Sequence, residues 1–316
     1  MNRFVKQLGH CIRLLTFAII VSIGTAQAAS DVKKNGFTLH NSQIPSDEIH
    51  RGGPPKDGIP AIDTPGFITA NMATHLTSDS RVLGITHKGI SKAYPINIMN
   101  WHEIVNDRFA SEAVTVSFCP LCGSGVAYST PSGTSGFGVS GLLYNSDVLL
   151  YDRDTESLWS QILSRAVSGP RAGERLTRLP LSHTSWGKWY KQHPQTLVLS
   201  QDTGFSREYH RDPYARYADS SGVYFPVKQR DPRYHPKERV IGIQLDGHTR
   251  AYPFSELART DGNISDRIGT HTITVRYNDA DQSGIILNEQ GNELATITAF
   301  WFAWYAFHPE TEVFKP

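Results

Sequence analysis

The sequence has 316 residues, of which 39% are hydrophobic and 19% are charged, and its formal net charge is +1. These proportions are typical of a globular chain, and the basic residues form no block or stripe, which argues against nucleic acid or an anionic membrane as a partner. With only three cysteines, a scaffold held together by several disulfides is excluded.

The N-terminal segment has the pattern of a secretory signal peptide. Arg3, Lys6 and Arg13 precede an apolar run from Leu14 to Gly24, and small residues follow up to Ala28. The run is shorter than the roughly 20 residues that a helix needs to cross a bilayer. We therefore expect cleavage after Ala28, no membrane span in the mature chain, and a periplasmic or secreted protein.

Two segments of the remaining chain resemble each other. Arg-Val-Leu-Gly-Ile at 81–85 returns as Arg-Val-Ile-Gly-Ile at 239–243, and Ala-Tyr-Pro at 93–95 returns at 251–253. A weaker match joins 154–156 to 310–312. This self-similarity predicts an internal repeat. The predicted parts are a signal peptide (1–28), an N-terminal extension (29–49), a first unit (50–165), a connecting segment (166–219) and a second unit (220–316).

Each unit is predicted to contain the same short elements. A strand (82–86; 240–245), a glycine-containing turn and a second strand ending at Tyr-Pro lead into a short helix, which extends to residue 105 in the first unit and to about 259 in the second. More strands are expected at 114–118, 126–129, 136–141 and 273–277. The expected fold class is therefore α+β, mainly antiparallel, with two pseudo-duplicated β-rich units and short helices in one compact body.

Further elements are expected outside these matching stretches. Residues 186–190 predict a helix and 196–200 a strand, while 202–236 form a polar, aromatic-rich loop that suits an ordered wrap over the surface better than a flexible linker. The aromatic run 300–307 is too short to cross a membrane and is typical of a buried core strand.

The motif Cys119-Pro120-Leu121-Cys122-Gly123 comes directly after a predicted strand. Both sulfurs then lie in one tight turn, which suits a shared metal ion or a small disulfide ring. The corresponding positions of the second unit are Asn278 and Asp281. The fold therefore does not require the cysteines, and a function specific to the first unit is expected.

His102 is the histidine nearest to this motif in the predicted unit, and it gives the third ligand of a copper or zinc site with Cys119 and Cys122. A fourth position is left for water, substrate or a side chain such as His75, His87 or Asp147. The alternative for His102 is a histidine held by hydrogen bonds on a helix. Asp147, Asp152 and Arg153 form a second concentration of polar groups, which we predict to act as catalytic residues beside the cysteines; a charged turn with a buried Asp–Arg pair is the alternative.

Three functions remain open at this point. The first is a metalloprotein, in its strongest form an oxidoreductase, that uses copper or zinc. The second is a non-catalytic binding or assembly module with a Cys119–Cys122 disulfide and the tyrosine-rich loop as its partner surface. The third is thiol–disulfide exchange, although no helix follows Cys122 as it does in thioredoxin-like proteins. Substrate, protein partner and oligomeric state are not indicated.

Four segments of the chain carry a family resemblance: 100–107 (Asn-Trp-His-Glu-Ile-Val-Asn-Asp), 118–123 (Phe-Cys-Pro-Leu-Cys-Gly), 140–147 and 158–161. They resemble the prokaryotic family catalogued as domain of unknown function number 3179, exported proteins with a Cys-Pro-x-Cys-Gly motif. The resemblance extends over most of the mature chain. It implies that the site lies at these motifs, and it supplies no mechanism.

Overall fold

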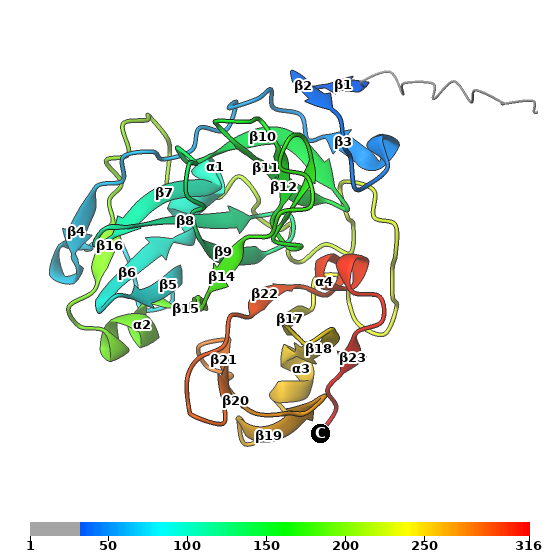
Figure 1. Cartoon of the computed structure of the whole chain (residues 1–316). Helices are drawn as coiled ribbons and strands as arrows, with labels where there is room; N and C mark the ends of the chain where they lie inside the picture. The colour runs from blue at the N-terminus through cyan, green and yellow to red at the C-terminus, as the bar shows by residue number, and fades with distance from the viewer. Residues whose placement is uncertain (1–31) are drawn as a thin grey trace, which may run out of the picture. The chain divides into compact units, whose positions relative to one another are not determined.

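Most strands of the protein pair in antiparallel fashion, in a computed structural model that describes residues 32–316 (Figure 1). The strands form four sheets and one short hairpin, and the helices are few and short. The mainly antiparallel α+β fold expected from the sequence is therefore confirmed. The predicted signal peptide over 1–28 lies outside the described residues.

The largest sheet joins strands from distant parts of the chain. Its order is β23-β18-β17-β22-β9-β8-β7, with β14 paired to β9. These strands are β7 (Ile104–Phe109), β8 (Glu112–Cys119), β9 (Ser124–Ser129), β14 (Thr177–Leu179), β17 (Arg239–Leu245), β18 (His248–Pro253), β22 (Ile297–Phe300) and β23 (Glu312–Val313). The link between β9 and β22 is the pair Gly125–Thr298, so the strand that follows the cysteine motif pairs with the C-terminal part of the chain.

Two five-stranded sheets complete the N-terminal part. One has the order β15-β5-β6-β16-β4 and the other β13-β12-β11-β10-β3. The first consists of β4 (Phe67–Thr69), β5 (Arg81–His87), β6 (Ile90–Pro95), β15 (Ser182–Ser185) and β16 (Leu197–Leu199). The second consists of β3 (Ile49–Arg51), β10 (Phe137–Tyr144), β11 (Asp147–Asp152), β12 (Leu158–Ser160) and β13 (Arg165–Ser168).

The remaining elements are a three-stranded meander, a hairpin and the helices. The meander is β19 (Asn263–Ile268), β20 (His271–Asn278) and β21 (Ser283–Asn288), and the hairpin is β1 (Val32–Lys34) with β2 (Phe37–Leu39). The α-helices are α1 (Ile96–His102), α2 (Trp186–Gln192), α3 (Phe254–Leu257) and α4 (Trp301–Phe307), and short 3-10 turns lie at Ser46–Glu48 and Ala70–Met72. In the described part of the chain, no helix is long and apolar enough to cross a membrane.

One pattern of strand pairing occurs twice. In residues 81–199, which we call the first region, β15 pairs antiparallel with β5 and β16 pairs parallel with β6. In residues 239–313, the second region, β22 pairs with β17 and β23 with β18 in the same senses. Even the register agrees, since Ser185 lies opposite Arg81 and Phe300 lies opposite Arg239. The matching elements of the first region thus extend beyond residue 165, where the first unit was expected to end.

Two expectations about local structure are wrong. The first helix ends at His102 rather than at 105, because Glu103 adopts a left-handed conformation (φ 58°) and Ile104 begins β7. The aromatic run is the helix α4 instead of a strand. Five of its seven residues are buried. The helix is therefore apolar on nearly all sides and lacks the polar face by which an amphipathic helix is recognised in a sequence.

The weaker sequence match between 154–156 and 310–312 also has no counterpart in the pairing. Residues 154–156 lie in the turn after β11, whereas 310–312 lead into β23. The strand of the first region that corresponds to β23 is β16, because β16 pairs with β6 as β23 pairs with β18. Thr196 before β16 and Thr311 before β23 make the same contact, since each accepts a hydrogen bond from the indole nitrogen of a buried tryptophan.

Candidate metal centre

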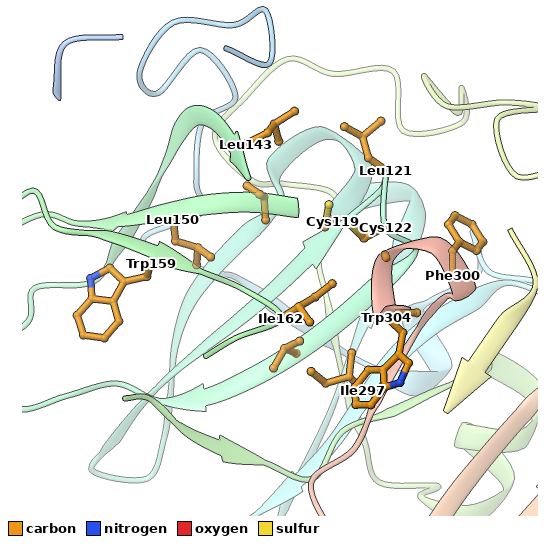
Figure 2. Packing of buried hydrophobic residues seen from close by; sticks show 14 of the residues in the cluster. Cys119, Leu121, Cys122, Leu143, Leu150, Trp159, Ile162, Ile297, Phe300 and Trp304 are labelled. Atoms are coloured by element: carbon orange, nitrogen blue, oxygen red, sulfur yellow. The ribbon is translucent and has the colours of Figure 1, made fainter. Parts of the chain in front are cut away.

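The cysteine motif forms a tight turn between β8 and β9, at the centre of the main hydrophobic core. Figure 2 shows Cys119 and Cys122 side by side, surrounded by apolar residues that include Ile162 and Phe300. Both are free thiols, and their exposed fractions are 1% and 0%. The strand pair Cys119–Ser124 closes the turn, and the Phe300 amide donates a hydrogen bond to the Cys122 carbonyl at 2.8 Å.

Gly123 makes this turn possible. It adopts φ 59°, and a Cβ at this position would lie 2.9 Å from the Phe300 ring. The left-handed conformation favours a glycine there, and the close approach of the Phe300 ring requires one; Gln282 holds the corresponding position of the second region at φ 45°. The sequence therefore fixes the turn locally, while β22 fixes it from the other end of the chain.

A two-residue hairpin brings polar groups to the sulfurs. Asn145 and Ser146 connect β10 to β11 with φ 51° and 66°, which is the backbone that a type I′ hairpin turn requires and that asparagine tolerates well. The Ser146 carbonyl lies 3.4 Å from Cys122 Sγ and 3.9 Å from Cys119 Sγ. The first residue of β11, Asp147, follows directly.

Asp147 is the residue that the structure adds to the two cysteines. Its Oδ1 lies 4.0 Å from Cys122 Sγ, and the ligand atoms of Cys119, Cys122 and Asp147 all lie within 4.8 Å of one another. Its Oδ2 accepts hydrogen bonds from Ser160 Oγ at 2.8 Å and from the Ile162 amide at 3.1 Å. The carboxylate is fully buried and held in a fixed orientation.

A second carboxylate, that of Glu103, belongs to the same electrostatic environment. Its left-handed backbone ends α1, its exposed fraction is 7%, and within 32–316 its side chain makes no hydrogen bond or ion pair. A non-glycine residue in this conformation carries backbone strain, and such residues gather at functional sites. Glu103 is therefore a buried acid that the fold itself does not neutralise.

These acidic groups would repel one another if all of them were ionised. Burial raises the pKa of Asp147 to about 7, although its hydrogen bonds act in the opposite direction. Burial and the Asp147 carboxyl raise the pKa of Glu103 to about 8. Burial, Cys119 and the two carboxyls raise the pKa of the Cys122 thiol. In the absence of a bound cation, the site favours the protonated form of each of these groups.

The positive charge of Lys237 interacts with the Cys122 thiol. Its Nζ donates hydrogen bonds to the carbonyls of Ser220 and Gly222 at 3.2 and 2.5 Å, and it lies 3.7 Å from the centre of the Tyr217 ring. Burial lowers the pKa of Lys237 to about 8, and the Cys122 thiol counteracts this shift. The loop over 202–236, which supplies Tyr217, thus covers the cysteine turn.

His102 does not join the cysteines. Its Nδ1 lies 2.8 Å from the Pro60 carbonyl and its Nε2 2.7 Å from the Tyr209 hydroxyl, so both ring nitrogens are engaged elsewhere. Glu103, which follows the helix, is instead the neighbour whose charge acts on Asp147 and Cys122. The hydrogen-bonded alternative describes the position of His102. His75 and His87 are not in the group of ligand atoms either, and His87 pairs with Glu112 at 2.7 Å.

Asp152 and Arg153 also lie away from the cysteines. Asp147 and Asp152 begin and end β11, so they are about 16 Å apart along the strand and on opposite faces. Asp152 accepts hydrogen bonds from Trp159 Nε1 and from the Thr155 amide. Arg153 pairs with Asp63 at 3.0 Å instead of with Asp152. Of the three predicted catalytic residues, the structure brings only Asp147 to the site.

Sequence reasoning did not select Glu103 or Ser146 as site residues. Glu103 differs between the two predicted units, since Asp261 occupies its place in the second, and this was a usable signal. Ser146 contributes only a backbone carbonyl, which any residue type would supply. Its role depends on the hairpin geometry, for which the sequence offers the Asn-Ser pair alone.

The comparison with known families agrees with the motifs at this site. The chain matches the family described as "Protein of unknown function (DUF3179)" over residues 56–292, which include both cysteines, Glu103 and Asp147. The protein belongs to this family. No curated protein and no solved structure matches the chain. Function therefore has to be argued from the chemistry of the site.

Proposed function

We propose that this DUF3179 protein is an exported metal-binding protein that holds one zinc ion with Cys119, Cys122 and Asp147. The observation that carries the proposal is the convergence of two thiols and one carboxylate within 4.8 Å in the core. Around a tetrahedral zinc ion with bonds near 2.3 Å, ligand atoms are about 3.7 Å apart. The 4.0 Å between Cys122 Sγ and Asp147 Oδ1 is close to that spacing.

The donor set favours zinc over copper. Two thiolates suit either zinc or Cu(I), but a carboxylate oxygen is a hard donor that zinc accepts and Cu(I) does not favour. Asp147 is oriented by Ser160 and the Ile162 amide, as carboxylate ligands in metal sites are. Three protein ligands leave a fourth position, which is the arrangement of catalytic rather than structural zinc sites.

Charge supports the same proposal. Without a metal ion, burial favours the protonated forms of Asp147, Glu103 and Cys122, and a bound zinc ion would stabilise the ionised forms of its ligands. The charge of Glu103 acts on Asp147 and Cys122, so this buried acid would respond to a metal ion bound there, which would supply Lewis acidity. Zinc does not change its oxidation state, so such a site would support Lewis-acid chemistry such as hydrolysis rather than electron transfer at the metal.

The two alternatives have less support. Thiol–disulfide exchange needs a sulfur that a partner thiol can attack, whereas both sulfurs are buried. A structural disulfide would leave the position of Asp147 beside the two sulfurs unexplained. The disulfide nevertheless makes a distinct prediction, because it leaves no free thiol and no metal.

The test is elemental analysis of the purified full-length protein, with free thiols counted in parallel. Wild type is expected to contain one equivalent of zinc. Cys119→Ser is expected to lose it, and Asp147→Asn to hold it much more weakly, because each change removes a ligand. The matched control is Asp281→Asn, which changes the corresponding turn of the second region and is expected to retain full zinc content.

A finer variant tests the orientation of Asp147. Ser160→Ala removes one hydrogen bond to Oδ2 and should lower zinc affinity by about 10–100-fold, as changes behind a metal ligand do. Competition with a chromophoric chelator measures this affinity. Copper in place of zinc would change the assignment of the metal. No metal together with zero free thiols would contradict the proposal and leave the disulfide.

A further inference from the structure

A cavity of about 250 Å³ borders the cysteine turn. Phe118, Pro120 and Gly123 form one wall, so the cavity touches the backbone of the turn on both sides of the two cysteines. Its volume is below the roughly 300–1,000 Å³ of sites for drug-sized ligands. It has room for a small ligand or for one group of a larger ligand. A larger cavity of about 460 Å³ lies between α2 and β21 and includes no residue of the turn.

Four residues that line this cavity each have one buried polar atom that makes no hydrogen bond to another residue of 32–316. These atoms are Arg81 Nε, Arg239 Nη2, His183 Nδ1 and Tyr217 Oη. His183 is only 8% exposed. Buried polar groups in folded proteins are nearly always paired. These unsatisfied atoms lie at or behind the wall of one cavity, so small movements of their side chains would let them bind hydrogen-bond acceptors placed in it.

The two arginines give the cavity a positive charge. Arg81 and Arg239 occupy matching positions in the first and second regions, and both donate to the Gln282 carbonyl at 3.1 Å. Like charges brought together repel, and burial followed by the charge of Arg81 lowers the pKa of Arg239 to about 9. An anion between them would relieve this repulsion.

The acidic groups nearby do not supply that anion. Asp212 is the acidic side chain among the lining residues, and its Oδ1 already accepts from Asn100 Nδ2 and the Tyr214 amide. Asp281 acts on the charge of Arg81 from outside the cavity wall, and its Oδ1 accepts from Ser185 Oγ. Glu238 acts on the charge of Arg239, and its Oε1 accepts from the Ser255 amide. Both Nη atoms of Arg81 and the Nη1 atom of Arg239 donate to backbone carbonyls, which leaves Arg81 Nε and Arg239 Nη2 as buried nitrogens without a partner in the described part of the chain.

We propose that this cavity binds the oxyanion group of a small ligand, a carboxylate or a phosphate, through Arg81, Arg239 and Tyr217. Guanidinium groups match the planar, multidentate geometry of these anions, and the tyrosine hydroxyl adds a neutral donor. His183 Nδ1 provides a fourth contact. The anion site does not depend on the metal, but an anion held there lies against the turn that carries two of the proposed zinc ligands.

Isothermal titration of the full-length protein with inorganic phosphate and, separately, with acetate tests the proposal. Saturable binding of one equivalent is expected, and the tighter of the two anions identifies the ligand class. Arg239→Gln and Arg81→Gln should each weaken binding about tenfold or more, because each removes a charged hydrogen bond. Tyr217→Phe should weaken it less. The exposed Arg211 next to Asp212 supplies the control, and Arg211→Gln should bind as wild type does.

Two further variants keep the result interpretable. Arg239→Lys retains the charge without the planar group, so it is expected to fold and to bind less tightly than wild type. Cys119→Ser is expected to lose zinc but to keep anion binding, which separates this site from the metal centre. Absence of saturable binding for both anions would overturn the proposal. The proposal would also be overturned if wild type, Arg239→Lys and Tyr217→Phe bound the anion with equal affinity. It would be overturned as well if Cys119→Ser lost anion binding.

Discussion

The first and second regions use the same packing devices. In each, a tryptophan of the helix packs against a strand glycine, where a Cβ would lie 2.3 Å (Gly84) or 2.2 Å (Gly242) from the ring. The same tryptophan, Trp189 or Trp304, lies 4.0 or 4.1 Å from the ring of the histidine after its helix. We propose, as the sequence predicts, that the two regions are copies of one unit.

The two regions differ where the chemistry lies. In the first region, residues 130–181 lie between β9 and β15 and include β10 to β14. In the second region, the corresponding segment between β21 and β22 is only 289–296. Asp147 and Ser146 belong to that longer segment. In the second region the corresponding turn has no cysteine, and the Asn278 side chain closes it by accepting from the Asp281 amide at 2.8 Å.

This difference indicates that the paired strands and their turn do not require the cysteines. The turn keeps its shape with cysteines or with Asn278 and Asp281. The candidate ligands need two separate elements of the first region, the turn and the β10–β11 hairpin. Substitutions in the shared packing should therefore affect stability in both regions, whereas substitutions in the turn should affect metal content in the first region alone.

The largest effect on stability is expected from the shared tryptophans. Trp304 and Trp189 are 0% and 3% exposed, and truncating a buried tryptophan to alanine typically costs about 3–5 kcal/mol. Urea denaturation should give comparable losses for Trp304→Ala and Trp189→Ala, and almost none for Met72→Ala, which is 62% exposed. A large loss for one tryptophan and none for the other would show that the regions are not equivalent.

A smaller, asymmetric effect is expected from the buried ion pairs. Asp107 accepts from Lys92 at 2.8 Å, and both side chains are less than 10% exposed. Asp266 accepts from Arg250, which is 20% exposed and also binds Glu312. Asp107→Asn leaves a buried charge unpaired and should cost about 3 kcal/mol. Asp266→Asn should cost less, because Glu312 remains.

Urea denaturation of both aspartate variants measures this difference in the free energy of unfolding. The variant Glu312→Gln, combined with Asp266→Asn, should bring the cost in the second region closer to that in the first. Equal costs for the two single aspartate variants would mean that burial of the cation does not set the penalty.

A further effect, which appears only at acid pH, concerns His308. Burial, with a contribution from Arg178, lowers the pKa of His308 to about 4, while an unfolded histidine titrates near 6.5. The unfolded state therefore takes up the proton first, so stability should fall from about pH 6.5 down to about pH 4 and then stop responding to His308. His193, whose pKa burial lowers as well, should contribute in the same direction.

Free energies of unfolding measured from pH 7 to pH 4 check this prediction. The slope against pH should become flatter in His308→Gln, and the slope is the readout because the substitution also removes the contact with Trp304. His193→Gln serves as the comparison from the first region. An unchanged slope in His308→Gln would show that this histidine does not carry the acid sensitivity.

Much of the local structure could be predicted from the sequence. The strands β5, β8, β17 and β20 and the helix α2 lie where alternating and β-branched residues placed them, because strand formation follows side-chain pattern over a few residues. The exception is α4, whose residues are apolar on nearly every side. Without a polar face, the sequence carries no helical period to detect.

The sequence by itself determined that two cysteines share one turn after a strand, since a spacing of two residues leaves their sulfurs few other arrangements. Only the tertiary structure decided which other groups meet them. Asp147 reaches the turn through a hairpin, while His102 turns toward Tyr209 and Glu103 ends its helix in a left-handed conformation. These partners depend on strand register and on the direction of each side chain, which contacts between distant segments set.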